Sequence, residues 1–222
     1  MPCIYQTAKS IFLRNSSNVK WAESFGKAME YLRQFPEGAS YLNGASPEAE
    51  DYISKMANRF IQGRSITPSI PATVMDEMIG VILSSYYDIS AVDIPQAYNF
   101  HRLSMGAENV IGSLLEAYLA SVLEPAGWVW CSGSFVKAVD FIKPNAQMEQ
   151  WSLLQVKNRD NSENSSSSAI RNGTQIKKWF RTFSRNGATN WGNFPDEQLR
   201  SMMSEDKFKD FIVNYMRTLK KS

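Results

Sequence analysis

The chain has 222 residues, of which 43% are hydrophobic and 21% are charged. Its 24 lysines and arginines nearly balance 22 aspartates and glutamates, which leaves a net charge of +2. The apolar content excludes a disordered chain, and having only two cysteines excludes a disulfide scaffold. At roughly 100–200 residues per domain, this length predicts one large domain or two small ones. No apolar run reaches the ~18 residues that would span a bilayer, and the N-terminus lacks a signal-peptide pattern, so we expect a cytoplasmic protein.

The histidine content limits the metal sites and catalytic mechanisms that this chain could support. His101 is the single histidine of the chain. This excludes a histidine-rich zinc site and any mechanism that needs two histidines. A nucleophilic Ser-His or Cys-His arrangement would have to use His101 itself. If the protein is an enzyme, carboxylates, amides and lysine are therefore expected to carry the reaction.

The first hundred residues show the apolar spacing of helices. Apolar residues recur at intervals of three and four from Tyr5 to Leu13, from Val19 to Leu32 and from Val74 to Tyr87, and a further helix is expected after Ser46. The expected buried face of the last of these helices consists of Met75, Met78, Ile79, Ile82 and Leu83.

The pattern changes in the second half of the chain. A helix is predicted from Ser104 to Glu124. Strand-like segments rich in β-branched and aromatic residues follow at 128–131, 135–142 and 151–157. Helical spacing returns after Ala169, and a final helix is expected at 195–219. These elements predict an α/β fold, with a mixed central sheet flanked by helices and a helical N-terminal region beside it.

Three polar side chains could meet on this sheet. Gln155 and Lys157 are two residues apart in one strand and therefore share a face. Asp140 lies in the preceding strand, and neighbouring strands are only ~4.8 Å apart. Mg²⁺ prefers oxygen ligands, which Asp140, Gln155 and the backbone of Val156 could supply. A nearby lysine can orient or deprotonate a water, and Glu116 could complete the outer shell from its helix. Such a set suits phosphodiester hydrolysis without histidine.

Each of these residues also has an ordinary structural interpretation. Asp140 could cap a turn before Lys143. Gln155 and Lys157 could be the exposed alternation of a half-buried strand. Glu116 could be a solvated residue on a helix surface. The sequence leaves these alternatives open.

A locally basic segment follows the third strand. Between Gln155 and Arg185 there are seven basic and two acidic residues, so this segment carries +5 and the rest of the chain −3. Basic, amide and hydroxyl side chains suit contacts with DNA, although a solvated helix face beside a loop is the alternative. The expected base-reading residues are Arg159, Asn161, Asn164, Arg171 and Asn172. The expected phosphate contacts are Ser165 and Ser166 at a helix start and Lys177, Lys178 and Arg181 beyond it.

The stretch from Glu108 to Trp191 resembles the SinI-like type II restriction endonucleases, within the wider PD-(D/E)XK nuclease superfamily. The likeness is carried by ENVIGSLLEAYL, GWVWCSGSFVKAVDFI, WSLLQVKNRDNSENSSSSAIRNGT and KKWFR. It implies that Asp140 is the first metal-binding acid, that Lys157 is the lysine of the motif and that Glu116 is the helix glutamate. Gln155 stands where most members of the superfamily have Glu or Asp, so we expect weaker metal binding.

The resemblance implies a function and a division of the chain. It implies a Mg²⁺-dependent endonuclease that cuts double-stranded DNA at a short palindromic site such as GGWCC, where W is A or T. A palindrome cut on both strands calls for a homodimer. We predict that residues 1–100 serve dimerisation or DNA clamping and that 101–222 form the catalytic and DNA-recognition core. A structure-selective nuclease and a non-catalytic DNA-binding protein of the same fold are the alternatives.

Overall fold

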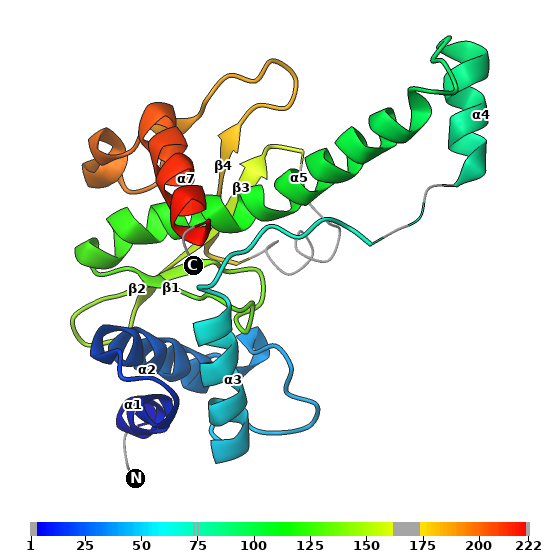
Figure 1. Cartoon of the computed structure of the whole chain (residues 1–222). Helices are drawn as coiled ribbons and strands as arrows, with labels where there is room; N and C mark the ends of the chain where they lie inside the picture. The colour runs from blue at the N-terminus through cyan, green and yellow to red at the C-terminus, as the bar shows by residue number, and fades with distance from the viewer. Residues whose placement is uncertain (1–3, 73, 75, 162–173, 221–222) are drawn as a thin grey trace. The chain divides into compact units, whose positions relative to one another are not determined.

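The computed structural model describes residues 4–72, 74, 76–161 and 174–220. Figure 1 shows the course of the chain. It divides into two compact units, a main unit of Met1–Ser65 with Leu115–Ser222 and a smaller unit of Ile66–Leu114. This division differs from a boundary near residue 100, because the first helices belong to the same unit as the sheet.

The first three helices follow the predicted apolar spacing closely. They are α1 (Ile4–Asn15), α2 (Val19–Gln34) and α3 (Glu50–Gln62). The side chain of Asn18 caps α2 by accepting a hydrogen bond from the Trp21 N–H at 3.0 Å. The buried faces meet in a cluster of rings whose neighbouring centroids are 5.4–6.2 Å apart, formed by Phe12, Phe25, Phe60 and Phe135. Phe135 belongs to the sheet region, so this core joins the helices to the sheet.

A four-stranded mixed sheet confirms the predicted α/β class. Its strands lie in the order β1 (Val129–Trp130), β2 (Phe141–Pro144), β3 (Trp151–Arg159) and β4 (Ile176–Thr182). β1 and β2 are antiparallel, as are β2 and β3, while β3 and β4 are parallel. β3 therefore pairs with β2 from Trp151 to Leu154 and with β4 from Leu153 to Arg159.

The strand predicted at 135–142 is shorter than expected. Only its end is β2, whereas the residues before it turn sharply, with positive φ at Gly133, Ser134 and Ala138. Val136 makes only an isolated bridge to Ala39. The apolar side chains of this segment are buried against the helices without extended pairing, which an apolar pattern alone does not distinguish from a strand.

The helix predicted after Ala169 is wrong over its described part, where β4 takes its place. Pairing with β3 runs from Leu153–Ile176 to Arg159–Thr182. Aromatic residues at 176–183 fit helical spacing, but here Trp179 packs on Trp191 and the adjacent Phe180 packs on Phe183, on opposite faces of the strand. Both faces of β4 carry a large ring, so the period of two is hidden.

The longest helix, α5 (Ile94–Leu123), begins well before the predicted start at Ser104. A 3₁₀ turn, η2 (Glu124–Ala126), and Gly127 with φ +87° end it as predicted. In the main unit its last turns lie on the face of the sheet opposite α1–α3, together with α7 (Glu205–Leu219) (Figure 1). Tyr118 packs there on Phe208, with ring centroids 5.4 Å apart.

Short helical turns complete the main unit. The helix predicted at 195–219 is two elements, because η4 (Glu197–Met202) ends before Ser204 caps α7 by accepting from the Lys207 N–H at 3.2 Å. The remaining 3₁₀ turns are η1 (Pro36–Gly38) and η3 (Trp191–Asn193). Among the helices of the described residues, none has the length and apolarity to cross a membrane.

The smaller unit does not bury the helix that its sequence marks as apolar. Asp76 caps α4 (Glu77–Tyr86) by accepting from the Met78 N–H at 2.9 Å. The predicted buried face is wrong for Met78, Ile79 and Ile82, which are 47–57% exposed, whereas Leu83 is half-buried and Met75 lies outside the described residues. The described part of this unit has too few elements to cover α4 from more than one side. An uncharged apolar surface is therefore left in contact with solvent.

The backbone of Gly133 lies close to Gly63 and to Arg59 of α3, and this close packing leads to a stability prediction. A Cβ on Gly133 would lie 2.4 Å from the Arg59 carbonyl oxygen, and Gly133 has φ +86°. We expect Gly133→Ala to lower the free energy of unfolding by about 2–5 kcal/mol, from left-handed strain plus overlap. Gly187→Ala is the matched control, since it has φ +72° with nothing within 4 Å. Its cost should be about 1–2 kcal/mol in chemical denaturation. Equal losses for the two variants would contradict the proposed contact.

Candidate active site

Asp140 is fixed against the middle of the central strand. Its backbone N–H donates to the Leu154 oxygen at 2.9 Å, and its carboxylate Oδ2 accepts from the Val156 N–H at 2.6 Å. The register that pairs Phe141 with Leu154 puts Asp140 opposite Gln155. Main-chain pairing thus places the Asp140 carboxylate beside the two motif residues of β3.

Gln155 and Lys157 occupy the same face of β3. Gln155 is almost fully buried, at 1% exposure, whereas Lys157 is half-buried toward the end of the strand. This burial differs from the structural alternative for this pair, in which both side chains would be solvent-exposed residues of a half-buried strand. In the parallel ladder with β4, Gln155 pairs with Lys178 and Lys157 pairs with Phe180, so the backbone of both residues is held by that strand.

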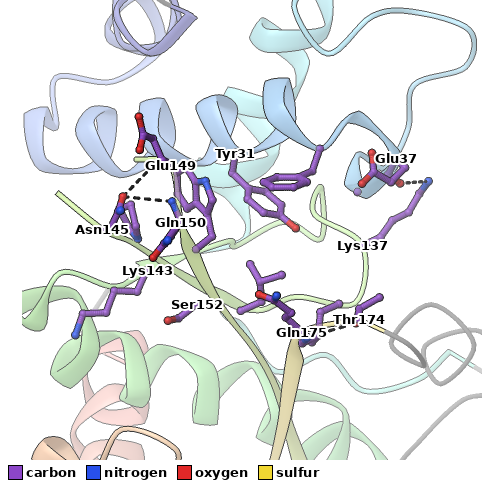
Figure 2. A pocket seen from close by; sticks show the side chains of 16 residues that line it. Tyr31, Glu37, Lys137, Lys143, Asn145, Glu149, Gln150, Ser152, Thr174 and Gln175 are labelled. Atoms are coloured by element: carbon purple, nitrogen blue, oxygen red, sulfur yellow. Dashed lines mark hydrogen bonds between the residues drawn. The ribbon is translucent and has the colours of Figure 1, made fainter. Parts of the chain in front are cut away.

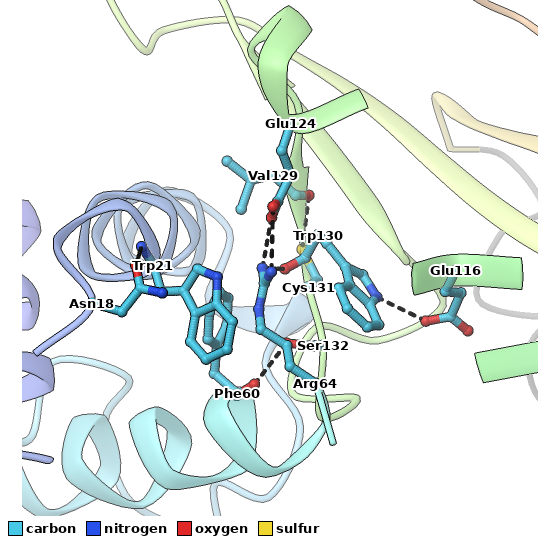
Figure 3. Close-up of polar contacts among 10 residues, drawn as sticks. All are labelled: Asn18, Trp21, Phe60, Arg64, Glu116, Glu124, Val129, Trp130, Cys131 and Ser132. Atoms are coloured by element: carbon cyan, nitrogen blue, oxygen red, sulfur yellow. Dashed lines mark hydrogen bonds and ion pairs between the residues drawn. The ribbon is translucent and has the colours of Figure 1, made fainter. Parts of the chain in front are cut away.

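Glu116 reaches the site from α5. The Trp130 indole N–H donates to its carboxylate Oε2 at 2.9 Å (Figure 3). Burial raises the pKa of Glu116 well above its ordinary value, and the negative charge of Asp140 raises it further, while Lys157 acts in the opposite direction. Glu116 is therefore not the solvated helix residue that the sequence left open.

The same electrostatic group includes Asp140. Burial raises the pKa of Asp140, against the hydrogen bond from Val156 and the positive charge of Lys157. The structure thus brings two carboxylates and one ammonium close together. The pKa of Glu116 responds to the charges of Asp140 and Lys157, and the pKa of Asp140 responds to the charge of Lys157. With both carboxylates ionised, one negative charge would remain uncompensated by these three groups.

The donor set at this point fits a hard cation with few anionic ligands. No group of three or more His, Cys, Asp or Glu side chains suited to a metal occurs in the part of the chain that the structure describes. The predicted ligands include only one such residue, Asp140, beside the amide of Gln155 and the backbone of Val156. Burial is the main reason that the pKa values of Asp140 and Glu116 are raised, and a bound divalent cation would favour the ionised form of both carboxylates. The site therefore fits an oxygen-coordinated cation held by charge on two carboxylates.

The strand geometry of β4 separates the predicted phosphate contacts. Lys178 pairs with Gln155 and so shares the face of the candidate site, whereas Lys177 is exposed on the other face. Arg181 forms an ion pair with Glu205 and donates to Asn158 Oδ1 at 2.9 Å. Its side chain is 11% exposed, so intramolecular partners occupy its guanidinium.

The other predicted DNA contacts lie near the end of β3. Arg159 is its last residue and Asn161 follows it, and both are exposed. The remaining predicted contacts are outside the described residues: Asn164, Ser165, Ser166, Arg171 and Asn172.

A pocket of about 910 Å³ is lined in part by the first residues of β3 (Figure 2). Leu153, two residues before Gln155, lies at one side of it, and the rings of Tyr31 and Trp151 are packed 5.4 Å apart in its wall. Lys137 and Lys143 also line it. Sequence reasoning missed this pocket because its walls come from α2, η1, the turns before and after β2 and three strands. The sequence positions of Lys137 and Lys143 alone did not indicate that these segments lie together in the fold.

The fold and this arrangement define a nuclease core of the restriction-endonuclease type. Residues 8–218 match the family described as SinI restriction endonuclease. The chain is 46% identical over 210 residues to the type II restriction enzyme SinI of Salmonella infantis, covering 91% of this chain and 90% of that protein. It is also 46% identical over 204 residues to the type II restriction enzyme Eco47I of Escherichia coli, covering 90% and 89%. The chain belongs to the SinI restriction endonuclease family.

Metal binding by the two carboxylates can be measured without DNA. A cation that binds only the folded state raises its stability, by about 2.7 kcal/mol at a hundredfold excess over the dissociation constant. We expect Mg²⁺ or Ca²⁺ to raise the melting temperature of the native protein, and Asp140→Asn to abolish this rise. The amide oxygen introduced by this substitution can still accept from Val156, so the variant should fold. Asp51→Asn, at an exposed position on α3, is the control. An unchanged metal effect in Asp140→Asn would exclude Asp140 as a ligand.

Proposed function

We propose that this chain is a Mg²⁺-dependent type II restriction endonuclease that cuts both strands of a short palindromic DNA site. The observation that carries the proposal is the convergence of Asp140, Gln155, Lys157 and Glu116 at one point of the sheet, in a member of a restriction endonuclease family. The sequence GGWCC is proposed from the family resemblance alone. A DNA substrate in the cell is also the basis for proposing a cytoplasmic location.

The side chains have distinct roles in this proposal. Asp140, the Gln155 amide oxygen and the backbone of Val156 would hold Mg²⁺, and Glu116 would add charge from the α5 side. Bound Mg²⁺ would offset charge on the scissile phosphate and activate the attacking water. Lys157 is placed beside both carboxylates, where its ammonium can orient that water and neutralise developing charge.

Gln155 sets the charge balance of the site. An amide oxygen binds Mg²⁺ but contributes no negative charge. Asp140 and Glu116 therefore supply the anionic charge that a Glu at position 155 would otherwise share. Two carboxylates against Lys157 leave a single negative charge, so we expect weak binding of Mg²⁺ in the absence of DNA. The scissile phosphate would then complete the site.

The DNA is proposed to follow the face of the sheet that carries Gln155 and Lys157. Lys178 lies on this face, Leu153 from the lining of the pocket shares it, and the exposed Arg159 and Asn161 stand at the end of β3. Lys137, which was not among the predicted contacts, lines the pocket with an exposed side chain. Arg181 is left out, because Glu205 and Asn158 already bind it. Recognition of the bases is still proposed for the predicted residues around Arg171.

The proposed homodimer would use the apolar surface of α4. One chain carries one such site, and two strands of a palindrome require two sites related by a twofold axis. The exposed apolar residues of this helix are Met78, Ile79, Val81, Ile82 and Tyr86. Glu77 is the single charged residue of α4, so a second copy could bury this surface without losing ion pairs. Dimerisation is therefore assigned to the smaller unit, rather than to residues 1–100 as a whole.

Sequencing the ends of plasmid DNA after digestion tests the activity and its specificity together. We expect discrete fragments with one recurring end sequence in Mg²⁺, and no cleavage in excess chelator. Lys157→Ala should lower the cleavage rate at least about a hundredfold, as loss of a general acid–base group does. DNA binding should persist, because the remaining basic contacts are intact.

The control is Lys55→Ala, which removes an exposed lysine of α3. It should cleave like the native protein. Wild-type turnover in Lys157→Ala would remove the proposed role of that ammonium. Preferred cutting of branched DNA, or binding without cutting, would favour the alternative functions.

Charge on the α4 surface should separate dimerisation from folding. We expect Ile79→Glu combined with Ile82→Glu to give a monomer in sedimentation, because two buried carboxylates would oppose association. Plasmid should then be nicked in one strand faster than it is linearised. Ser85→Glu adds charge to an exposed position of the same helix without removing apolar surface, and should remain a dimer. A dimeric double variant would contradict this interface.

A further inference from the structure

A chain of contacts behind the candidate site ends on Glu116. Trp130 lies in β1 with 4% exposure, and its indole N–H is the donor to the Glu116 carboxylate. The next residue, Cys131, donates its backbone N–H to the Asp140 carbonyl oxygen at 2.8 Å. Two consecutive residues of the chain therefore hold the two acidic residues of the site.

The indole of Trp130 is itself held by a buried cation (Figure 3). The Arg64 guanidinium carbon lies 4.9 Å from the centroid of this indole, and an Arg64 N–H donates to the Trp130 carbonyl oxygen at 3.3 Å. On its other sides Arg64 contacts the rings of Phe60 at 4.4 Å and Trp21 at 5.0 Å. The ring of Trp130 is thus held by the Arg64 cation and by its hydrogen bond to Glu116.

Arg64 has little freedom to move away from this position. Its side chain is 5% exposed and pairs with Glu124 through two nitrogens, at 2.7 and 3.3 Å. Its Nε has no hydrogen-bond partner among the described residues. A cation buried this far is retained only by its ion pair and stacked rings. These contacts fix Trp130 from the side opposite Glu116.

We propose that Trp130, clamped by Arg64, is a positioning residue that orients the Glu116 carboxylate toward Asp140 and Lys157. The contact occupies Oε2, so the second oxygen of Glu116 would be the one available to hold a cation. A hydrogen bond from outside the ligand set commonly governs metal affinity, and its loss costs about 10–100-fold. The inference rests on the proposed role of Glu116 in the metal site.

Trp130→Phe tests this role by removing the N–H while retaining a ring for Arg64. We expect the Mg²⁺ concentration for half-maximal cleavage to rise about 10–100-fold, with much of the rate restored at saturating Mg²⁺. The rise in melting temperature caused by Mg²⁺ should shift to higher concentrations by a similar factor. This second readout needs no cleavage and does not respond to a general loss of stability.

Trp128→Phe is the matched control. Trp128 is 6% exposed, and its indole N–H also donates to a carboxylate, Asp196 Oδ2, at 3.1 Å. Asp196 is not among the groups whose charges shift the pKa values of Glu116 and Asp140. This variant should lose the same kind of bond without changing the Mg²⁺ dependence. Equal shifts in the two variants would overturn the proposal.

Glu116→Gln separates this inference from the proposed function. Native cleavage and metal binding in Glu116→Gln would remove Glu116 from the site, and with it the role of Trp130. If Glu116→Gln is defective while Trp130→Phe keeps the native Mg²⁺ dependence, only the positioning role of Trp130 is overturned. If Trp130 acts through Glu116, adding Trp130→Phe to Glu116→Gln should produce no further shift.

Arg64→Lys provides a second variant should Trp130→Phe fail to fold. It keeps a cation opposite Glu124 but removes the planar group from the indole face. We expect a smaller shift in Mg²⁺ dependence in the same direction. A native Mg²⁺ dependence in a folded Arg64→Lys protein would show that the clamp does not govern Glu116.

Discussion

The site depends on one hydrogen bond, from the Val156 N–H to the Asp140 carboxylate. It joins the carboxylate to the backbone of the central strand, between the two motif residues of β3. The paired main chains of β2 and β3 set the depth of Asp140, and this bond sets its direction. A buried carboxylate without such a donor would be costly and would take up a proton instead.

The two layers that flank the sheet contribute differently to that site. On one side the helices α1–α3 form an apolar core with the residues before β2, and Arg64 packs against the Phe60 ring of this core. On the other side the end of α5 supplies Glu116. The cation of the proposed reaction would therefore lie where a strand pair, a helix and a clamped indole converge. The N-terminal helices thus belong to the same compact unit as the sheet that carries the candidate site.

Much of the fold and of the site could be predicted from local pattern. The three N-terminal helices and the central strand have clear periodicity, and Asp140, Gln155 and Lys157 were recognisable because strand alternation fixes which side chains share a face. β4 was mistaken for a helix because rings on both of its faces conceal a period of two. The apolar face of α4 was expected to be buried because spacing gives amphipathicity but not the presence of a neighbour. Trp130 and Arg64 were missed because the partners that define their roles are far away in sequence.

The sequence by itself determined the α/β class, the identity of the motif residues and the resemblance to restriction endonucleases. These follow from short-range spacing, which is set by backbone geometry that every chain shares. Only the tertiary structure decided that Glu116 joins Asp140, that Arg181 is bound internally and that Lys177 and Lys178 lie on opposite faces. Each of these depends on strand register or on a contact between distant segments. Such contacts form through burial and pairing of the whole unit, so no local pattern specifies them.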